Sequence, residues 1–155
     1  MITLNLPFYQ FKTKIINEKS YIFDSLRKKY VLLTPEEWVR QNFVNYLIIE
    51  KKYPKSRIVN EIQIELNGLK KRCDTLVLNA ELIPIIIIEY KAPSVEINQN
   101  TFDQAAVYNE KLKVDYLIIS NGLQHYCFNI NSNTHRYNFL NQIPNYNSVL
   151  ENMIK

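Results

Sequence analysis

The chain has 155 residues, of which 46% are hydrophobic and 22% charged, a composition that is typical of a globular protein and excludes a disordered tail. Its net charge of +4 permits an anionic partner but is too small to identify one. Two glycines, Gly68 and Gly122, are too few for a glycine-rich nucleotide loop, so we expect no nucleotide cofactor. The sequence shows no membrane span or signal peptide, so we expect a cytoplasmic protein with no membrane partner.

The first third of the sequence predicts a β-hairpin followed by a helix. Two β-prone runs, 21–23 and 30–33, surround a polar turn and favour the hairpin. Residues 34–37 (Thr-Pro-Glu-Glu) are typical of a helix start, with threonine as the N-cap, proline at the first helical position and glutamate at the capping-box position. We expect the helix to run to Lys51 or Lys52.

The middle of the sequence predicts three strands. Residues 58–66 and 71–78 are separated by a turn at 67–68 (Asn-Gly), which favours a second hairpin. The run 83–91 contains four consecutive isoleucines and is apolar on both faces until its end. Such a pattern is typical of a central strand that is covered on both sides.

The second half of the sequence predicts a helix and two further strands. The helix is expected over 101–110, with Thr101 or Asn100 as its N-cap. The strands are expected over 114–120 and 125–130, joined by a turn that contains glycine.

The order of these elements indicates an α/β (α+β) protein with a mixed central sheet of about four to five strands, flanked by helices, and an extra N-terminal hairpin. One core is the default for this length, so we expect a single domain over 1–155. Within it we expect an N-terminal extension with the hairpin (1–33), a core (34–130) and a C-terminal tail (131–155) with a candidate helix at 146–154.

Three charged side chains are predicted at the ends of buried strands. Because side chains alternate along a strand, Asp74 shares a face with Leu76, and Glu89 and Lys91 share a face with Ile87. Buried carboxylates are costly unless they are paired, and Mg²⁺ is commonly held by one or two carboxylates together with water and phosphate oxygens. The pattern therefore predicts metal-assisted hydrolysis of a phosphodiester, in which the lysine orients water or steadies developing charge.

A structural role for the same residues is the alternative. Asp74 could pair with Lys91 in a salt bridge, and Glu-x-Lys tripeptides are common by chance. The isoleucine run that precedes Glu89 favours the catalytic interpretation, because charge is unexpected at a central strand.

Several ordered motifs fit together along the chain from Tyr21 to Phe128. They are residues 33–41, the strand of Glu61, 71–74 (Lys-Arg-Cys-Asp), 89–93 (Glu-Tyr-Lys-Ala-Pro), 104–109 (Gln-Ala-Ala-Val-Tyr-Asn) and 120–122 (Ser-Asn-Gly). In this order the sequence resembles the N-terminal nuclease domain of type I restriction enzyme R subunits. The resemblance implies a restriction-endonuclease-like PD-D/E-x-K fold and a Mg²⁺-dependent endonuclease that acts on double-stranded DNA, with Mn²⁺ as a substitute metal.

The resemblance also implies roles for individual residues. Asp74 and Glu89 would be metal ligands, Tyr90 could add only its backbone carbonyl, and Lys91 would be the catalytic lysine. A Gln-x-x-x-Tyr element of the family is matched by residues 104 and 108, Gln104 and Tyr108, which would border the site from one helix face. The alternative is that Tyr108 is a core aromatic and Gln104 a surface residue.

The first helix of such nucleases contributes a glutamate, and this sequence offers Glu36 and Glu37. The capping-box position is a sufficient explanation for Glu37. Glu36 lies on the helix face of Phe43 and precedes Arg40 by four residues, which is the family's usual spacing. We therefore expect Glu36 to be the helix carboxylate and a weaker metal ligand.

The chain's partners are predicted from its charges and from the resemblance. Lys70, Lys71 and Arg72 precede Asp74 and could contact DNA phosphates, although a solvated turn is an equal alternative. Restriction R subunits continue into an ATP-driven motor that this sequence does not contain, so we expect a need for separate motor, specificity or methylation subunits. The second hypothesis is a catalytically silent nuclease-like module that binds DNA or protein.

Overall fold

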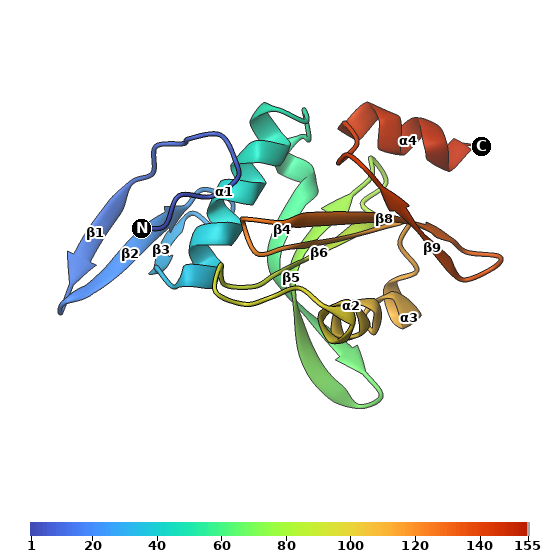
Figure 1. Cartoon of the computed structure of the whole chain (residues 1–155), viewed down its shortest axis with the longest axis horizontal. Coiled ribbons are helices and arrows are strands. Elements are labelled where there is room, and N and C mark those ends of the chain that lie inside the picture. Colours follow the sequence, from blue (N-terminus) through green and yellow to red (C-terminus); the bar gives the residue numbers. More distant parts are fainter. Residues whose placement is uncertain (155) are drawn as a thin grey trace.

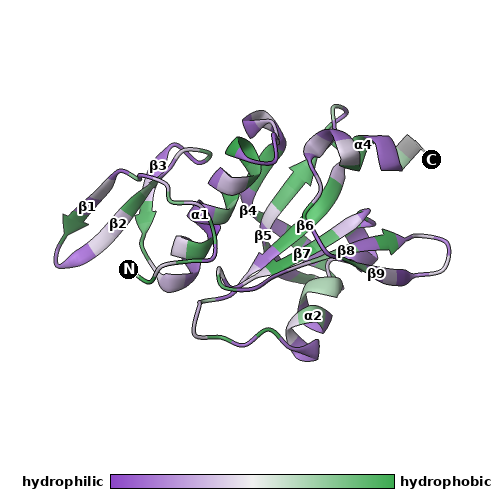
Figure 2. Ribbon diagram, turned by 45° about the horizontal axis from the view of Figure 1, so that its top comes forward, coloured by the Kyte–Doolittle hydropathy of each residue, from purple (hydrophilic) through white to green (hydrophobic). Residues whose placement is uncertain are grey.

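The isoleucine run forms the central strand of the protein, in a computed structural model that describes residues 1–154 (Figure 1). This strand is β6 (Pro84–Tyr90), and its four isoleucines, Ile85 to Ile88, are 0% exposed. It pairs antiparallel with β5 (Leu69–Leu78) and parallel with β7 (Tyr116–Ser120), so the sheet is mixed, as predicted. Figure 2 shows hydrophobic residues concentrated in β5 and β6, as expected for strands that are covered on both faces.

The sheet around β6 has six strands in the order β4-β5-β6-β7-β8-β9. The predicted hairpin of β4 (Ile58–Leu66) and β5 is confirmed, and both residues of its Asn67-Gly68 turn have positive φ angles. Beyond β8 (His125–Asn131) lies β9 (Arg136–Leu140), so the predicted limit of about five strands was wrong. β9 is mostly exposed, and an edge strand of this kind lacks the apolar alternation that would predict it.

A separate three-stranded antiparallel sheet precedes the first helix. Its strands are β1 (Thr13–Ile16), β2 (Lys19–Asp24) and β3 (Lys29–Leu32). The pairing of β2 with β3 confirms the predicted N-terminal hairpin, whereas β1 was not predicted. All four residues of β1 are exposed, so no buried face marks this strand in the sequence.

The first helix, α1 (Pro35–Ile49), lies between the two sheets (Figure 1). Thr34 is its N-cap, as predicted, and the Thr34 hydroxyl accepts a 3.0 Å hydrogen bond from the backbone N–H of Glu37. The helix ends two or three residues before the predicted end, because Lys52 has a left-handed φ of 60° and Tyr53 N–H donates back to Leu47 O. Val39, Phe43 and Leu47 form its buried face against the central sheet.

The predicted helix over 101–110 is replaced by two shorter ones, α2 (Gln99–Ala106) and α3 (Asn109–Leu112). The predicted caps, Thr101 and Asn100, were wrong: Asn98 is the N-cap, and it forms a reciprocal capping box with Thr101 at 3.2 and 3.3 Å. Ala105 of α2 packs with Ile87 and Leu117, so α2 covers the sheet face opposite α1 (Figure 1).

The predicted C-terminal helix is confirmed as α4 (Tyr146–Ile154). It is anchored on the central sheet by Val149, which is fully buried, and by Tyr146, whose hydroxyl donates to Leu78 O at 2.9 Å. Among residues 1–154, no helix combines the length and the hydropathy that a membrane crossing requires.

Candidate functional site

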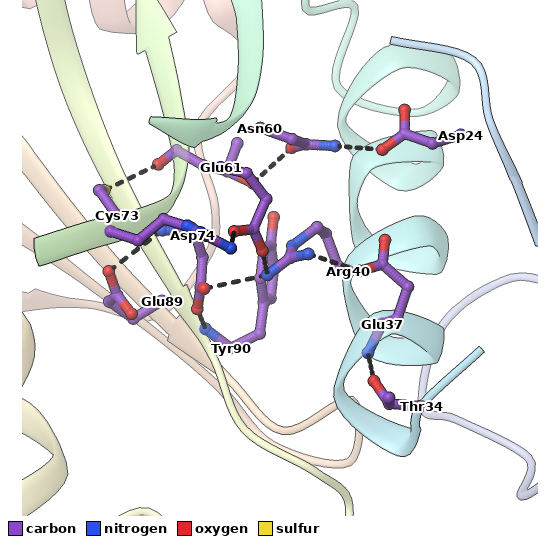
Figure 3. A network of polar contacts seen from close by, with 12 residues as sticks. Asp24, Thr34, Glu37, Arg40, Asn60, Glu61, Cys73, Asp74, Glu89 and Tyr90 are labelled. Atoms are coloured by element: carbon purple, nitrogen blue, oxygen red, sulfur yellow. Dashed lines mark hydrogen bonds and ion pairs between the residues drawn. The ribbon is translucent and has the colours of Figure 1, made fainter. Parts of the chain in front are cut away.

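The β5–β6 pairing brings Asp74 and Glu89 together where the two strands diverge. The register pairs Thr75 with Ile88, so Asp74 and Glu89 occupy the next opposing positions. Glu89 Oε1 accepts a long 3.4 Å hydrogen bond from Asp74 N–H, and Asp74 Oδ2 accepts a 2.8 Å bond from Tyr90 N–H (Figure 3). Two carboxyl groups therefore face each other across an antiparallel ladder, and both can be ionised at once only if a cation compensates their charges.

Electrostatics identify a third carboxylate near this pair. Burial and the charge of Asp74 raise the pKa of Glu89 to about 9. Burial and the same Asp74 charge raise the pKa of Glu36 on α1, while the positive charges of Arg40 and Lys91 act against that shift. Glu36, Asp74 and Glu89 are half-buried, and we call them the carboxylate edge.

Lys91 directly follows β6 and continues its pairing with β7, because Lys91 N–H donates to Ser120 O at 2.9 Å. Its side chain is half-buried and close enough to Glu36 to lower that group's pKa. Among residues 1–154, Asp74 forms its ion pair with Arg40 and none with Lys91, so the predicted alternative of an Asp74–Lys91 salt bridge is not present. The structure thus brings Glu36, Asp74, Glu89 and Lys91 into one region.

The centre of this region contains a residue that sequence reasoning missed, Arg40. It is 3% exposed, and Figure 3 shows it reaching from α1 toward β4 and β5. Arg40 Nη2 lies 2.6 Å from Glu61 Oε1 and 3.0 Å from Asp74 Oδ1. A charged residue on an otherwise apolar helix face, one turn after Glu36, was the signal that could have identified it.

Glu61 was also missed as a site residue. It lies on β4 opposite Asp74, between the register pairs Asn60–Thr75 and Ile62–Cys73. Its φ of 59° is left-handed, which is unfavourable for a non-glycine residue inside a strand. Such strain next to a cluster of carboxylates is commonly found at functional sites, and it is not visible in a sequence.

The interpretation of Glu37 as a capping-box residue was right for its backbone, which donates to Thr34, but not for its side chain. Its side chain accepts hydrogen bonds from Arg27 Nη2 at 2.7 Å, Arg40 Nη1 at 2.5 Å and Gln41 Nε2 at 2.8 Å. Arg27 in turn binds Asp24 at the end of β2. We call Asp24, Arg27 and Glu37, with their amide partners Gln41 and Asn60, the support network.

Gln104 and Tyr108 were expected on one helix face, but α2 ends between them. Tyr108 is the residue before α3, and its hydroxyl donates to Arg72 O at 2.8 Å. Burial and the charge of Glu89 raise the pKa of Tyr108 to about 12, and the hydrogen bond holds its hydroxyl at Arg72, two residues before Asp74. Gln104 is exposed on α2, and no contact within the described residues brings it to the carboxylates.

The predicted DNA contacts lie on the hairpin of β4 and β5, which projects beyond α2 (Figure 1). Lys70 and Lys71 are exposed there. Arg72 is 70% exposed and pairs with Glu61 Oε2 at 3.1 Å. The three cations are therefore accessible, and one of them is connected to the site through Glu61.

The carboxylate edge offers oxygen donors of the kind that Mg²⁺ prefers. Within residues 1–154, no group of three or more His, Cys, Asp or Glu side chains is arranged to hold a metal ion. Two carboxylates with water and phosphate oxygens are sufficient for Mg²⁺, and each carboxylate oxygen retains a second lone pair beside its present hydrogen bond. The pair Asp74 and Glu89, in which burial and the charge of Asp74 raise the Glu89 pKa, therefore fits a divalent cation.

Comparisons with known proteins agree with this geometry. Residues 35–144 match the model of the family described as type I restriction enzyme R protein N terminus (HSDR_N). A solved fragment, described as an HsdR subunit of a type I restriction enzyme from Vibrio vulnificus YJ016, superposes with a TM-score of 0.59 at 19% identity.

The shared region covers 78% of this chain and 25% of that one, so the present chain spans about a quarter of its relative. At this identity the likeness shows the fold alone. No curated protein is similar enough to count as a match. The chain belongs to the family of type I restriction enzyme R protein N-terminal domains.

Proposed function

We propose that this chain is a Mg²⁺-dependent endonuclease of the PD-D/E-x-K type that hydrolyses phosphodiester bonds of double-stranded DNA. The observation that carries the proposal is the opposed pair Asp74 and Glu89, in which the Glu89 pKa is raised to about 9. Family membership and a mixed sheet with α1 and α2 on opposite faces support the restriction-endonuclease-like fold.

Each residue of the site has a distinct task. Asp74 and Glu89 would hold the metal, with the Tyr90 carbonyl and the more distant Glu36 as further oxygen donors. When bound, Mg²⁺ polarises the scissile phosphate and lowers the pKa of a coordinated water. The Lys91 ammonium orients the attacking water and offsets the negative charge that develops on the phosphate.

Two neighbours prepare the site without reacting. Arg40 fixes Asp74 through the 3.0 Å contact and so acts as a positioning residue. Tyr108, with Gln104 further out, borders the substrate side, and Lys70, Lys71 and Arg72 contact DNA phosphates outside the cleavage point.

The biological setting is part of the proposal. Family membership supports a type I restriction context, in which DNA and other subunits would be its partners. We propose that the chain forms a single domain, acts in the cytoplasm and cuts when separate motor, specificity or methylation subunits deliver DNA to it.

The test is cleavage of supercoiled plasmid and of linear DNA by the purified protein with Mg²⁺, Mn²⁺ or EDTA. Asp74→Asn and Lys91→Ala should each lower the rate by about 100-fold or more. Lys55→Ala removes an exposed lysine in the short turn before β4, to which no role in the site is given, and serves as the matched control. Cutting by both site variants at the wild-type rate would refute the mechanism.

One observation favours the second hypothesis, a catalytically silent module. Arg40 already supplies a positive charge to Asp74, so part of the charge that a metal would compensate is compensated internally. Salt-sensitive DNA binding with no cutting under any metal, and with the other restriction subunits present, would support this alternative.

A further inference from the structure

The net charge of the protein is located in its N-terminal region. Residues 1–33 contain 6 Lys or Arg and 2 Asp or Glu, which gives +4, the net charge of the whole chain. The remaining residues contain 13 basic and 13 acidic side chains and are neutral overall. The excess charge therefore belongs to the three-stranded sheet and its connections, a region that none of the roles above uses for binding.

Most of this charge is accessible. Arg27 and Asp24 pair with each other, and Arg27 also binds Glu37, so these charges are compensated internally. Five lysines remain exposed, with Glu18 as the exposed acidic residue among them. The five are Lys12, Lys14, Lys19, Lys28 and Lys29.

The two faces of the sheet have different chemistry. Ile22 and Asp24 of β2 lie on one face and are 0% exposed. The alternate residues lie on the other face, where Lys14 opposes Tyr21 and Phe23 opposes Tyr30. Lys14 and Lys19 therefore share this face, which we call the outer face, with three aromatic rings and two aliphatic side chains: Tyr21, Phe23, Tyr30, Ile16 and Leu32.

Contacts on the outer face order its side chains. Lys14 Nζ lies 3.9 Å from the centroid of the Tyr30 ring, and the Phe23 and Tyr30 rings meet edge-on at 5.2 Å. Lysines that neutralise phosphates, next to aromatic rings that contact sugars or bases, are the usual composition of nucleic-acid-binding surfaces.

The sheet is also connected to the candidate site by ion pairs. Arg27 Nη2 lies 2.7 Å from Glu37, and Arg40 bridges Glu37 at 2.5 Å and Asp74 at 3.0 Å. A polyanion bound to the outer face would thus be held by a surface that is fixed relative to the carboxylates.

We infer that the outer face of the N-terminal sheet is a second DNA-binding surface, which holds the backbone of duplex DNA outside the point of cleavage. The identity of the polyanion as DNA rests on the proposed function. The presence of a polyanion site rests on the charge and the geometry of the sheet alone.

The experiment is fluorescence anisotropy with a labelled DNA duplex, in EDTA so that no cleavage occurs, over a series of salt concentrations. The double variant Lys14→Glu/Lys19→Glu should weaken binding by about tenfold or more and reduce the salt slope by about 2. Lys55→Glu/Lys113→Glu changes two exposed lysines elsewhere by the same net charge and should shift binding by less than about threefold. Equal losses in the two double variants would overturn the inference, because net charge alone would then explain them.

Two further arms complete the design. Lys14→Gln/Lys19→Gln removes the two positive charges without adding negative ones. If this variant keeps native circular dichroism and an unchanged affinity for the duplex, the inference is also overturned. A loss confined to a single-stranded oligonucleotide would overturn the assignment to duplex DNA. Wild-type protein that never cuts, but binds in a manner sensitive to Lys14 and Lys19, would refute the proposed function and leave this surface established.

Discussion

The support network and the carboxylate edge lie on two sides of Arg40, and they differ in how many hydrogen-bond donors their acidic side chains receive. Both Asp24 oxygens accept hydrogen bonds, from two backbone N–H groups and from Arg27 and Asn60. At the carboxylate edge, Glu89 accepts a single bond of 3.4 Å from a backbone N–H. The first region therefore supplies strong donors to its acid, whereas the second supplies them to Asp74 and leaves Glu89 with one long bond.

The donors around each acid decide the direction in which its pKa moves. Burial alone would raise the pKa of Asp24, but the hydrogen bonds and the charge of Arg27 lower it. Burial and the charge of Asp74 raise the pKa of Glu89 to about 9, because its few hydrogen bonds do not offset them. A carboxylate with a structural role receives hydrogen bonds and a positive charge from the protein itself. A carboxylate without such partners is a candidate for binding an external cation.

The largest expected effect on stability comes from a substitution in the support network. Asp24→Ala leaves Arg27 and Asn60 without their partner, so we expect a loss of about 3–5 kcal/mol in the free energy of unfolding. Urea denaturation measures it. Glu36→Gln, which removes an acid without a hydrogen-bonded partner, should change stability by less than about 1 kcal/mol. Equal losses would contradict the distinction between the two regions.

The second prediction is that the two acids respond oppositely to pH. Between 4.5, the ordinary pKa of a glutamate, and about 9, Glu89 is protonated in the folded chain and ionised in the unfolded chain. Rising pH therefore favours the unfolded chain over that window, by at least about 1 kcal/mol. Asp24, whose pKa is lowered, loses its stabilisation instead as the pH falls below its ordinary value of 3.8.

Unfolding curves at several pH values, recorded in EDTA, measure this difference. Glu89→Gln should remove the loss of stability between pH 4.5 and about 9 and leave the acid limb unchanged. Mg²⁺ at about 100 times its Kd should stabilise the wild type by about 2.7 kcal/mol and leave Glu89→Gln unaffected. If the stability of the wild type does not change between pH 4.5 and about 9, the raised pKa of Glu89 is refuted.

The smallest effect concerns the border of the carboxylate edge. Tyr108→Phe deletes the 2.8 Å hydrogen bond to Arg72 O and should cost about 1 kcal/mol of stability. Gln104→Ala, on the exposed face of α2, should stay within about 0.5 kcal/mol. Thermal unfolding of the two variants side by side is the measurement. A larger loss of stability in Gln104→Ala would contradict the assignment of Tyr108 as the residue that borders the carboxylate edge.

The sequence by itself determined the elements that depend on local interactions. The isoleucine run specified β6, the Asn-Gly turn specified the β4–β5 hairpin, and Thr34 specified the start of α1. Strand alternation was also sufficient to predict that Asp74 and Glu89 would approach each other, because side-chain direction in a strand follows directly from position.

Only the tertiary structure decided which charges are compensated. Glu36 and Glu37 are adjacent in the sequence, yet Glu37 is bound by Arg27 from the N-terminal sheet and by Arg40, while burial and the charge of Asp74 raise the pKa of Glu36. The left-handed backbone of Glu61 and the edge strand β9 likewise depend on partners far along the chain. Ion pairs between distant segments follow no sequence period, so the pattern that located the carboxylates could not reveal the arginine between them.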